Sequence, residues 1–267
     1  FEGSWETRRA SVKKLRVQQD FDFVVLGVSV ASLPDVASEL IKREPQWREM
    51  VERVRTVPTQ AFQLWMREST ADLGWPHPPP NLSGFLEPFD TWAEMSHLIP
   101  EEDWQEPVRS IAYFCSVLPD ADPEAVTISE DFHREQKKIV RDNAVRFLDS
   151  GVGSLWPQAL DKGKFRWEVL AAEDRADSRT GAKRFDAQFW TANVNPADRY
   201  VQSLPGSIAY RISPLDMTLD NFTVAGDWTA SGLDSGCIES AVMSGLLAAH
   251  AISGKPGLQD IVGYDHP

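Results

Sequence analysis

Residues 225–245 read AGDWTASGLDSGCIESAVMSG, and this stretch decides the fold. The preceding residues 221–225, NFTVA, predict a short buried strand, and Gly226, Asp227 and Trp228 predict a turn at its carboxyl end. A loop of small residues follows, and apolar residues at helical spacing predict a helix over residues 236–253. The unit is therefore a strand, a glycine-rich loop and the N-terminus of a helix.

The N-terminus of this helix suits an anionic or electron-rich ligand. Its first-turn N–H groups have no partner within the helix, and the macrodipole is positive at that end. Asp227 follows a strand at the edge where open α/β sheets bind ligands, and its carboxylate can accept hydrogen bonds from ribose or ribityl hydroxyls. Because a carboxylate repels bare phosphate, we expect the loop and helix amides to bind the negative group. Plain α/β packing produces the same pattern, so the spacing leaves both interpretations open.

One face of the predicted helix is expected to be buried, because apolar residues recur along it at helical spacing. These residues are Ile238, Ala241, Val242, Gly245, Leu246, Ala249 and Ile252. Upstream, residues 21–30 (FDFVVLGVSV) predict a strand buried on both faces of a parallel sheet. Other predicted elements are helices over 36–41 and 47–54, strands over 61–69 and 110–118, and a helix over 130–148 capped by Ser129.

Composition narrows the class of protein. The chain has 267 residues, 42% of them hydrophobic, which is enough for a substantial core. Its net charge of -13 and the lack of a Lys/Arg stripe argue against nucleic acid and anionic lipid as partners. No apolar run reaches the roughly 18–20 residues that span a bilayer, so we expect no transmembrane segment. Two cysteines far apart in sequence favour reduced thiols and a cytoplasmic location, and the scattered histidines predict no metal site.

Residues 221–254, NFTVAGDWTASGLDSGCIESAVMSGLLAAHAISG, closely resemble the C-terminal FAD-binding motif of the flavin-containing amine oxidase superfamily. The likeness is strongest to its branch of carotenoid-desaturase-like and hydroxysqualene-oxidoreductase-like members. Residues 21–34, FDFVVLGVSVASLP, resemble the central strand of the family's FAD domain. Residues 195–212, NPADRYVQSLPGSIAYRI, resemble the segment that leads into its last strand.

This resemblance implies a mixed α/β fold of the p-hydroxybenzoate hydroxylase or monoamine oxidase type. Part of a Rossmann-like FAD-binding domain would combine with a substrate domain that has a mixed or antiparallel sheet and helices. The expected boundaries are 1–40 for the central segment of the FAD-binding domain, 41–205 for the substrate-binding domain and 206–267 for the C-terminal FAD-binding segment.

The resemblance also implies FAD as cofactor and a set of residues that bind it. Asp227 would bind the ribityl and pyrophosphate region. Backbone at Gly236, Cys237 and Ile238 would lie near the pyrimidine edge of the isoalloxazine, where a positive dipole stabilises the negative charge left by an arriving hydride. The rest of the expected site comprises Gly226, Trp228 and Ser235. No catalytic residue is assigned.

The sequence departs from the family in one respect, since it contains no G-x-G-x-x-G. The ADP-binding half of the site is therefore expected on a separate N-terminal FAD-binding segment, with this chain as the C-terminal portion of a longer flavoprotein. The predicted function is transfer of hydride from an apolar or amine organic substrate to flavin N5. Two alternatives stay open: a non-enzymatic binding or interaction module that keeps the fold without FAD, and an α/β protein that binds another nucleotide at the same loop.

Overall fold

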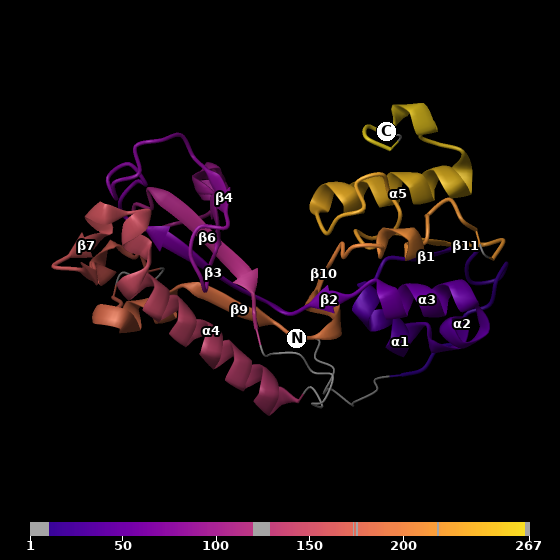
Figure 1. The fold of residues 1–267 in the computed structure, drawn as a ribbon, viewed down its shortest axis with the longest axis horizontal. Helices are drawn as coiled ribbons and strands as arrows, with labels where there is room; N and C mark the ends of the chain where they lie inside the picture. The colour runs from indigo at the N-terminus through magenta and orange to yellow at the C-terminus, as the bar shows by residue number, and fades with distance from the viewer. Residues whose placement is uncertain (1–10, 120–128, 173, 175, 218, 265–267) are drawn as a thin grey trace. The chain divides into compact units, whose positions relative to one another are not determined.

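The computed structural model describes residues 11–119, 129–172, 174, 176–217 and 219–264 (Figure 1). The chain divides into two compact units. Unit 1 comprises Phe1–Pro58 together with Asn195–Pro267, and unit 2 comprises Thr59–Val194. The segments at the two ends of the sequence therefore build one unit, and the middle of the chain builds the other. This mixed architecture of helices and sheets confirms the predicted fold class.

Unit 1 is built on a parallel pair of strands between two layers of helix. β1 (Val24–Leu26) runs parallel to β11 (Phe222–Val224), in agreement with the parallel sheet predicted for residues 21–30. α5 (Ile238–Ser253) lies along one side of the pair, and α1 to α3 lie on the other (Figure 1). Buried Trp47 of α3 (Pro45–Arg53) meets Phe222 edge-on, with ring centroids 5.7 Å apart. This packing brings residues from opposite ends of the chain into one core.

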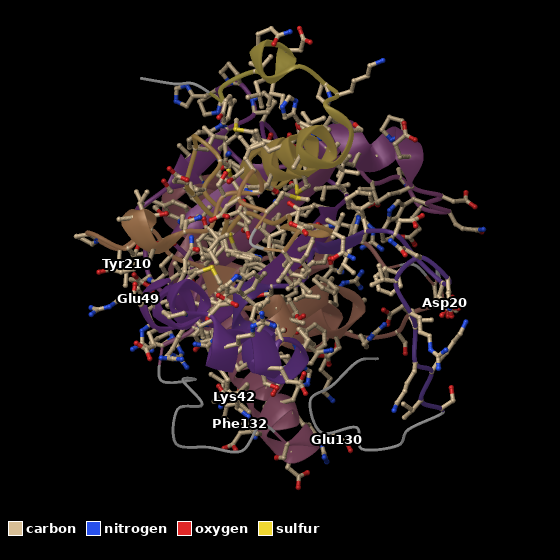
Figure 2. All side chains as sticks on the ribbon, turned by 90° about the vertical axis from the view of Figure 1, so that its right-hand side faces the viewer. Asp20, Lys42, Glu49, Glu130, Phe132 and Tyr210 are labelled. Atoms are coloured by element: carbon tan, nitrogen blue, oxygen red, sulfur yellow. The ribbon has the colours of Figure 1, made fainter. Side chains whose placement is uncertain are left out.

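The remaining regular elements of unit 1 are short. They include α1 (Leu33–Val36), α2 (Ser38–Arg43) and the antiparallel pair of β2 (Thr56–Val57) and β10 (Tyr200–Val201). The charged side chains of Lys42 and Glu49 lie on the solvent-exposed surface of α2 and α3 (Figure 2). None of the helices in the described part of the chain has the length and hydropathy needed to cross a bilayer.

Unit 2 is an antiparallel sheet covered on one face by a long helix. Its strands lie in the order β4 (Asn81–Ser83), β5 (Thr91–Glu94), β6 (Ser110–Val117), β3 (Thr59–Met66) and β9 (Phe189–Asn193). α4 (Glu130–Ser150) packs on this sheet, and Ser129 caps it by accepting a hydrogen bond from the Phe132 amide at 3.1 Å. The predicted strands over 61–69 and 110–118 and the predicted capped helix are confirmed. A small hairpin of β7 (Leu160–Asp161) and β8 (Lys164–Phe165) accompanies α4.

The two faces of this sheet differ. Phe62, Leu64 and Met66 alternate along β3 into an aromatic core beneath α4. Trp65 points to the opposite face, where it joins a smaller cluster around Ile111. That second face is half-buried and carries mixed polar and apolar side chains.

Two predictions about burial are wrong. β1 is shorter than residues 21–30, and its side chains are partly exposed where burial on both faces was expected. The face of α5 expected to be buried is the exposed one: Ile238 is 80% exposed, Val242 57% and Leu246 39%. The buried residues of α5 are Ser240, Met243, Ser244, Leu247 and Ala248. α5 is apolar or small on nearly every side, so helical spacing could not select the face that packs against β11.

Candidate functional site

The turn after β11 is tied to α5 by hydrogen bonds. The Gly226 amide donates to the Ser244 hydroxyl at 2.7 Å, and that hydroxyl donates to the Ala241 carbonyl at 2.7 Å. Gly226 has a φ of +146°, and a Cβ there would lie 2.6 Å from the Trp228 indole nitrogen. Both constraints require glycine at this position. The strand end is therefore held against the second turn of the helix.

Asp227 lies in this turn beside a buried arginine. Arg211 is 5% exposed, and its guanidinium donates to the Asp227 carbonyl at 2.6 Å and to the Ser203 hydroxyl at 3.1 Å. Burial raises the pKa of the Asp227 carboxyl, and the nearby Arg211 cation opposes that rise. The Arg211 Nε is buried without a hydrogen-bond partner among the described residues. The turn thus holds a half-buried carboxylate and an uncommitted donor.

Gly236 marks the close approach of the loop to β10. The Tyr200 hydroxyl donates to the Gly236 carbonyl. A Cβ at Gly236 would lie 2.7 Å from the Val201 carbonyl oxygen and 2.8 Å from the Tyr200 ring. α5 begins two residues later, and Cys237 is its N-cap. The Cys237 sulfur accepts a hydrogen bond from the Ser240 amide at 3.4 Å. Gly236 therefore occupies a backbone position that admits no side chain, two residues before the first turn of α5.

The other predicted site residues lie around this turn. Trp228 is buried in the unit 1 core, and its indole donates to the Val28 carbonyl at 2.9 Å. Its side chain therefore supports the loop from inside the unit. Ser235 is exposed, and Ile238 projects from the first turn of α5 into solvent. Asp227 and Gly226 lie at the strand end, whereas Gly236 begins the approach to the helix.

The sequence did not reveal the contacts by which Arg211, Tyr200 and Ser244 hold the loop in place. Arg211 was detectable, because it stands in the apolar stretch IAYRI, where a charge is costly without partners. The Tyr200 bond to Gly236 joins residues far apart in sequence, and no local pattern indicates such a contact.

These residues fit a flavin. A carboxylate at the end of a parallel strand can accept hydrogen bonds from sugar hydroxyls. The first-turn amides of α5 can stabilise negative charge. The buried Arg211 Nε is one further donor for an electron-rich group.

Comparison with known families agrees with this geometry. The model of the family described as flavin containing amine oxidoreductase matches residues 6–253. The chain therefore belongs to this family, and FAD is its expected cofactor.

Among solved structures, the chain is similar to an oxidoreductase from Methanosarcina mazei, with 11% identity and a TM-score of 0.47. The match covers 89% of this chain and 44% of that one, so the chain spans less than half the length of the structure it matches. No curated protein matches the sequence.

Proposed function

We propose that the chain is the C-terminal part of an FAD-dependent oxidoreductase that removes hydride from an apolar or amine organic substrate. FAD, when bound, supplies the hydride acceptor at N5. The observation that carries the proposal is the hydrogen bond from the Gly226 amide, next to Asp227 at the end of β11, to Ser244 in the second turn of α5. Membership of a flavin-containing family supports it.

Each part of this site has a separate task. The Asp227 carboxylate accepts hydrogen bonds from cofactor hydroxyls. The backbone at Gly236, Cys237 and Ile238 stabilises negative charge on the flavin through the amides and the dipole of α5. Arg211 positions the turn by binding the Asp227 carbonyl. We assign no chemical role to the side chains that position the organic substrate, because hydride transfer to a flavin often needs no acid or base of the protein beyond positioning.

We further propose that a strand and helix carrying G-x-G-x-x-G pack against the exposed side of α5 and complete the site. Ile238, Val242 and Leu246 form a row of exposed aliphatic side chains on α5, and an exposed apolar row of this kind marks a contact surface. A Val242→Ser variant should leave the chain folded but weaken its association with this segment. A Met243→Ser variant at the adjacent buried position should instead unfold unit 1. If the folded Val242→Ser variant associates as tightly as the original chain, the proposed surface is wrong.

Flavin uptake tests the cofactor site. The chain, mixed with a family segment that carries G-x-G-x-x-G, should take up FAD and acquire its visible absorbance. Asp227→Ala should weaken uptake by about 10-fold or more, since it removes a charged acceptor of hydrogen bonds. Asp220→Ala is the matched control, because Asp220 is an exposed carboxylate just before β11. Equal uptake by the two variants would contradict the role of Asp227.

The non-enzymatic module is the second candidate, and the exposed apolar side of α5 favours it as well. A complex that forms through α5 yet stays colourless with FAD would support that function. If NAD or ATP competes with FAD for the same loop, the site binds a different nucleotide. We also propose a cytoplasmic location, since Cys115 and Cys237 are both free thiols.

A further inference from the structure

A second candidate binding site lies within unit 2 and shares no residue with the turn after β11. It is a cavity of about 370 Å³, open to solvent at the edge of the sheet face that α4 leaves uncovered. The residues that line it are Trp65, Asp103, Trp104, Ala187, Gln188 and Phe189. They come from β3, from the segment after η2 (Ser96–Glu101), from the end of η7 (Gly181–Ala187) and from the start of β9. Three aromatic rings and one carboxylate thus meet in one small space.

The two indole rings are fixed in place by one acid. The Trp65 and Trp104 indole N–H groups both donate to the Glu102 carboxylate, at 2.6 and 2.5 Å. Their ring centroids are 5.6 Å apart with planes tilted by 42°. Because each indole donates to an anion, electron density is pushed toward its π face, which strengthens attraction for a cation. The wall is therefore rigid and electron-rich.

The floor of the cavity is equally well fixed. Gln188 is buried, accepts from the Trp65 amide at 2.9 Å and donates to the Ala171 carbonyl at 2.7 Å. Phe189 beside it is 50% exposed, which leaves a large ring uncovered at the mouth of the cavity. The arrangement is a preformed pocket with one half-exposed aromatic ring.

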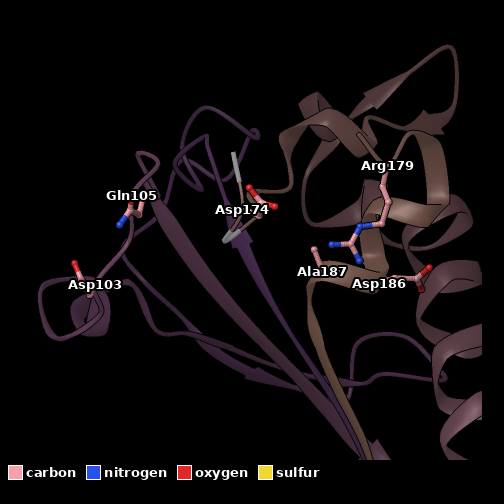
Figure 3. Close-up of a pocket in the computed structure, with 6 residues that line it drawn as sticks. All are labelled: Asp103, Gln105, Asp174, Arg179, Asp186 and Ala187. Atoms are coloured by element: carbon pink, nitrogen blue, oxygen red, sulfur yellow. The ribbon is translucent and has the colours of Figure 1, made fainter. Parts of the chain in front are cut away.

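Uncompensated charge at the mouth is negative. Among the described residues the exposed Asp103 carboxylate has no hydrogen-bond or ion-pair partner. Asp103 and Ala187 also line an adjoining cavity of about 630 Å³ (Figure 3). In that cavity the Arg179 guanidinium is already held by Asp177 at 2.8 Å, and Asp186 binds Arg141 at 2.6 Å. Asp103 therefore supplies a free negative charge next to the aromatic wall.

We propose that this cavity binds an alkylated ammonium ion of the trimethylammonium type. Such a cation has methyl groups that pack on Trp65, Trp104 and Phe189, and a diffuse positive charge that ring faces attract within about 6 Å. It has no N–H group, so a pocket of aromatic faces and one carboxylate satisfies it without further acceptors. The adjoining cavity gives room for the rest of a larger ligand. The proposal does not depend on flavin, because its residues all belong to unit 2.

Titration with tetramethylammonium chloride tests the site in the full chain. The indole N–H resonances of the ¹⁵N-labelled protein should shift saturably, since two of them belong to the wall of the cavity. Choline should bind too, whereas its neutral analogue 3,3-dimethylbutan-1-ol, which has the same shape, should not. Sodium chloride at equal concentration controls for ionic strength.

Variants identify the groups that bind the cation. Asp103→Asn and Phe189→Leu should each weaken binding about 3- to 30-fold, and both lie at exposed positions where the fold tolerates exchange. Asp161→Asn is the control, because Asp161 is an exposed carboxylate of β7 outside both cavities. The proposal is overturned if the original chain shows no saturable shift, if the neutral alcohol binds equally well, or if both cavity variants bind as tightly as Asp161→Asn.

Discussion

Replacing Gly236 by alanine should loosen the first turn of α5. The added Cβ would lie 2.7 Å from the Val201 carbonyl oxygen, about 0.7 Å closer than an ordinary contact of about 3.4 Å. Neither that carbonyl nor the Tyr200 ring at 2.8 Å is a flexible side-chain end, so the loop itself must move. Overpacking of this kind costs about 1–3 kcal/mol. The loss should be confined to unit 1.

Gly245→Ala is the matched control, since Gly245 lies on the helix that follows Gly236. An ideal Cβ at Gly245 meets no atom within 4 Å. Alanine in the middle of a helix is more stable than glycine by about 0.5–1 kcal/mol, so this variant should be stabilised. The two substitutions add the same methyl group to one segment yet should shift stability in opposite directions, by about 1.5–4 kcal/mol in total.

Hydrogen exchange of the α5 amides, followed by mass spectrometry, measures this difference locally and avoids treating two units as one unfolding transition. Gly236→Ala should speed exchange in α5, and Gly245→Ala should slow it. If the α5 amides exchange equally fast in the two variants, the loop accepts a side chain at position 236 without displacement, and the expected clash is refuted. Uptake of FAD by the chain mixed with a family segment that carries G-x-G-x-x-G should fall for Gly236→Ala, since the amides at 236–238 would no longer be held in place.

Three further outcomes follow from other parts of the chain. Phe62→Ala should lower the free energy of unfolding, measured by guanidinium titration, by about 3–5 kcal/mol, because Phe62 is fully buried. Val117→Ala, at an exposed position, should change the free energy of unfolding by about 0.5 kcal/mol or less. Burial, with a smaller effect of Cys115, raises the pKa of Tyr113 to about 12, so absorbance at about 295 nm should show one late-titrating phenol that Tyr113→Phe removes. Because the pKa of Tyr113 is raised on folding, its contribution to the free energy of unfolding is complete at pH values below its ordinary pKa. This contribution is lost as the pH rises toward 12. For Asp227 the raised pKa favours the folded state at low pH, so Asp227→Asn should be more stable than the original chain near neutral pH, and the two unfolding curves should converge below about pH 4.

Much of the fold could be predicted from local patterns. The capped helix after Ser129 and the strands that became β3 and β6 were predicted, because capping chemistry and runs of apolar residues are properties of short segments. A parallel-sheet strand at residues 21–30 and a second short strand before Gly226 were also predicted. Their pairing, which joins residues about 200 positions apart, was not predicted and appears only in the structure.

Contacts between distant segments could not be predicted. Arg211 binds the Asp227 carbonyl, and Tyr200 binds the Gly236 carbonyl, so both depend on how three segments of unit 1 meet. The aromatic cavity of unit 2 depends on the same kind of meeting. The tryptophans were visible in the sequence, but the sharing of Glu102 by Trp65 and Trp104 appears only when β3 and the segment after η2 are side by side.

The wrong prediction of the buried face of α5 has a physical cause. A helix buried on one side has a polar side that reveals its orientation, but α5 has small or apolar residues on both its packed and its exposed sides. The packed side uses Ser240 and Ser244, whose hydroxyls bind Ser231 and the Gly226 amide. The exposed side keeps Ile238, Val242 and Leu246, which have no such bonds to make. Because exposed aliphatic residues in a row add nothing to the stability of the chain that displays them, this side of α5 is best explained as a contact surface. The same pattern that misled the prediction of burial thus supports the contact surface proposed for α5.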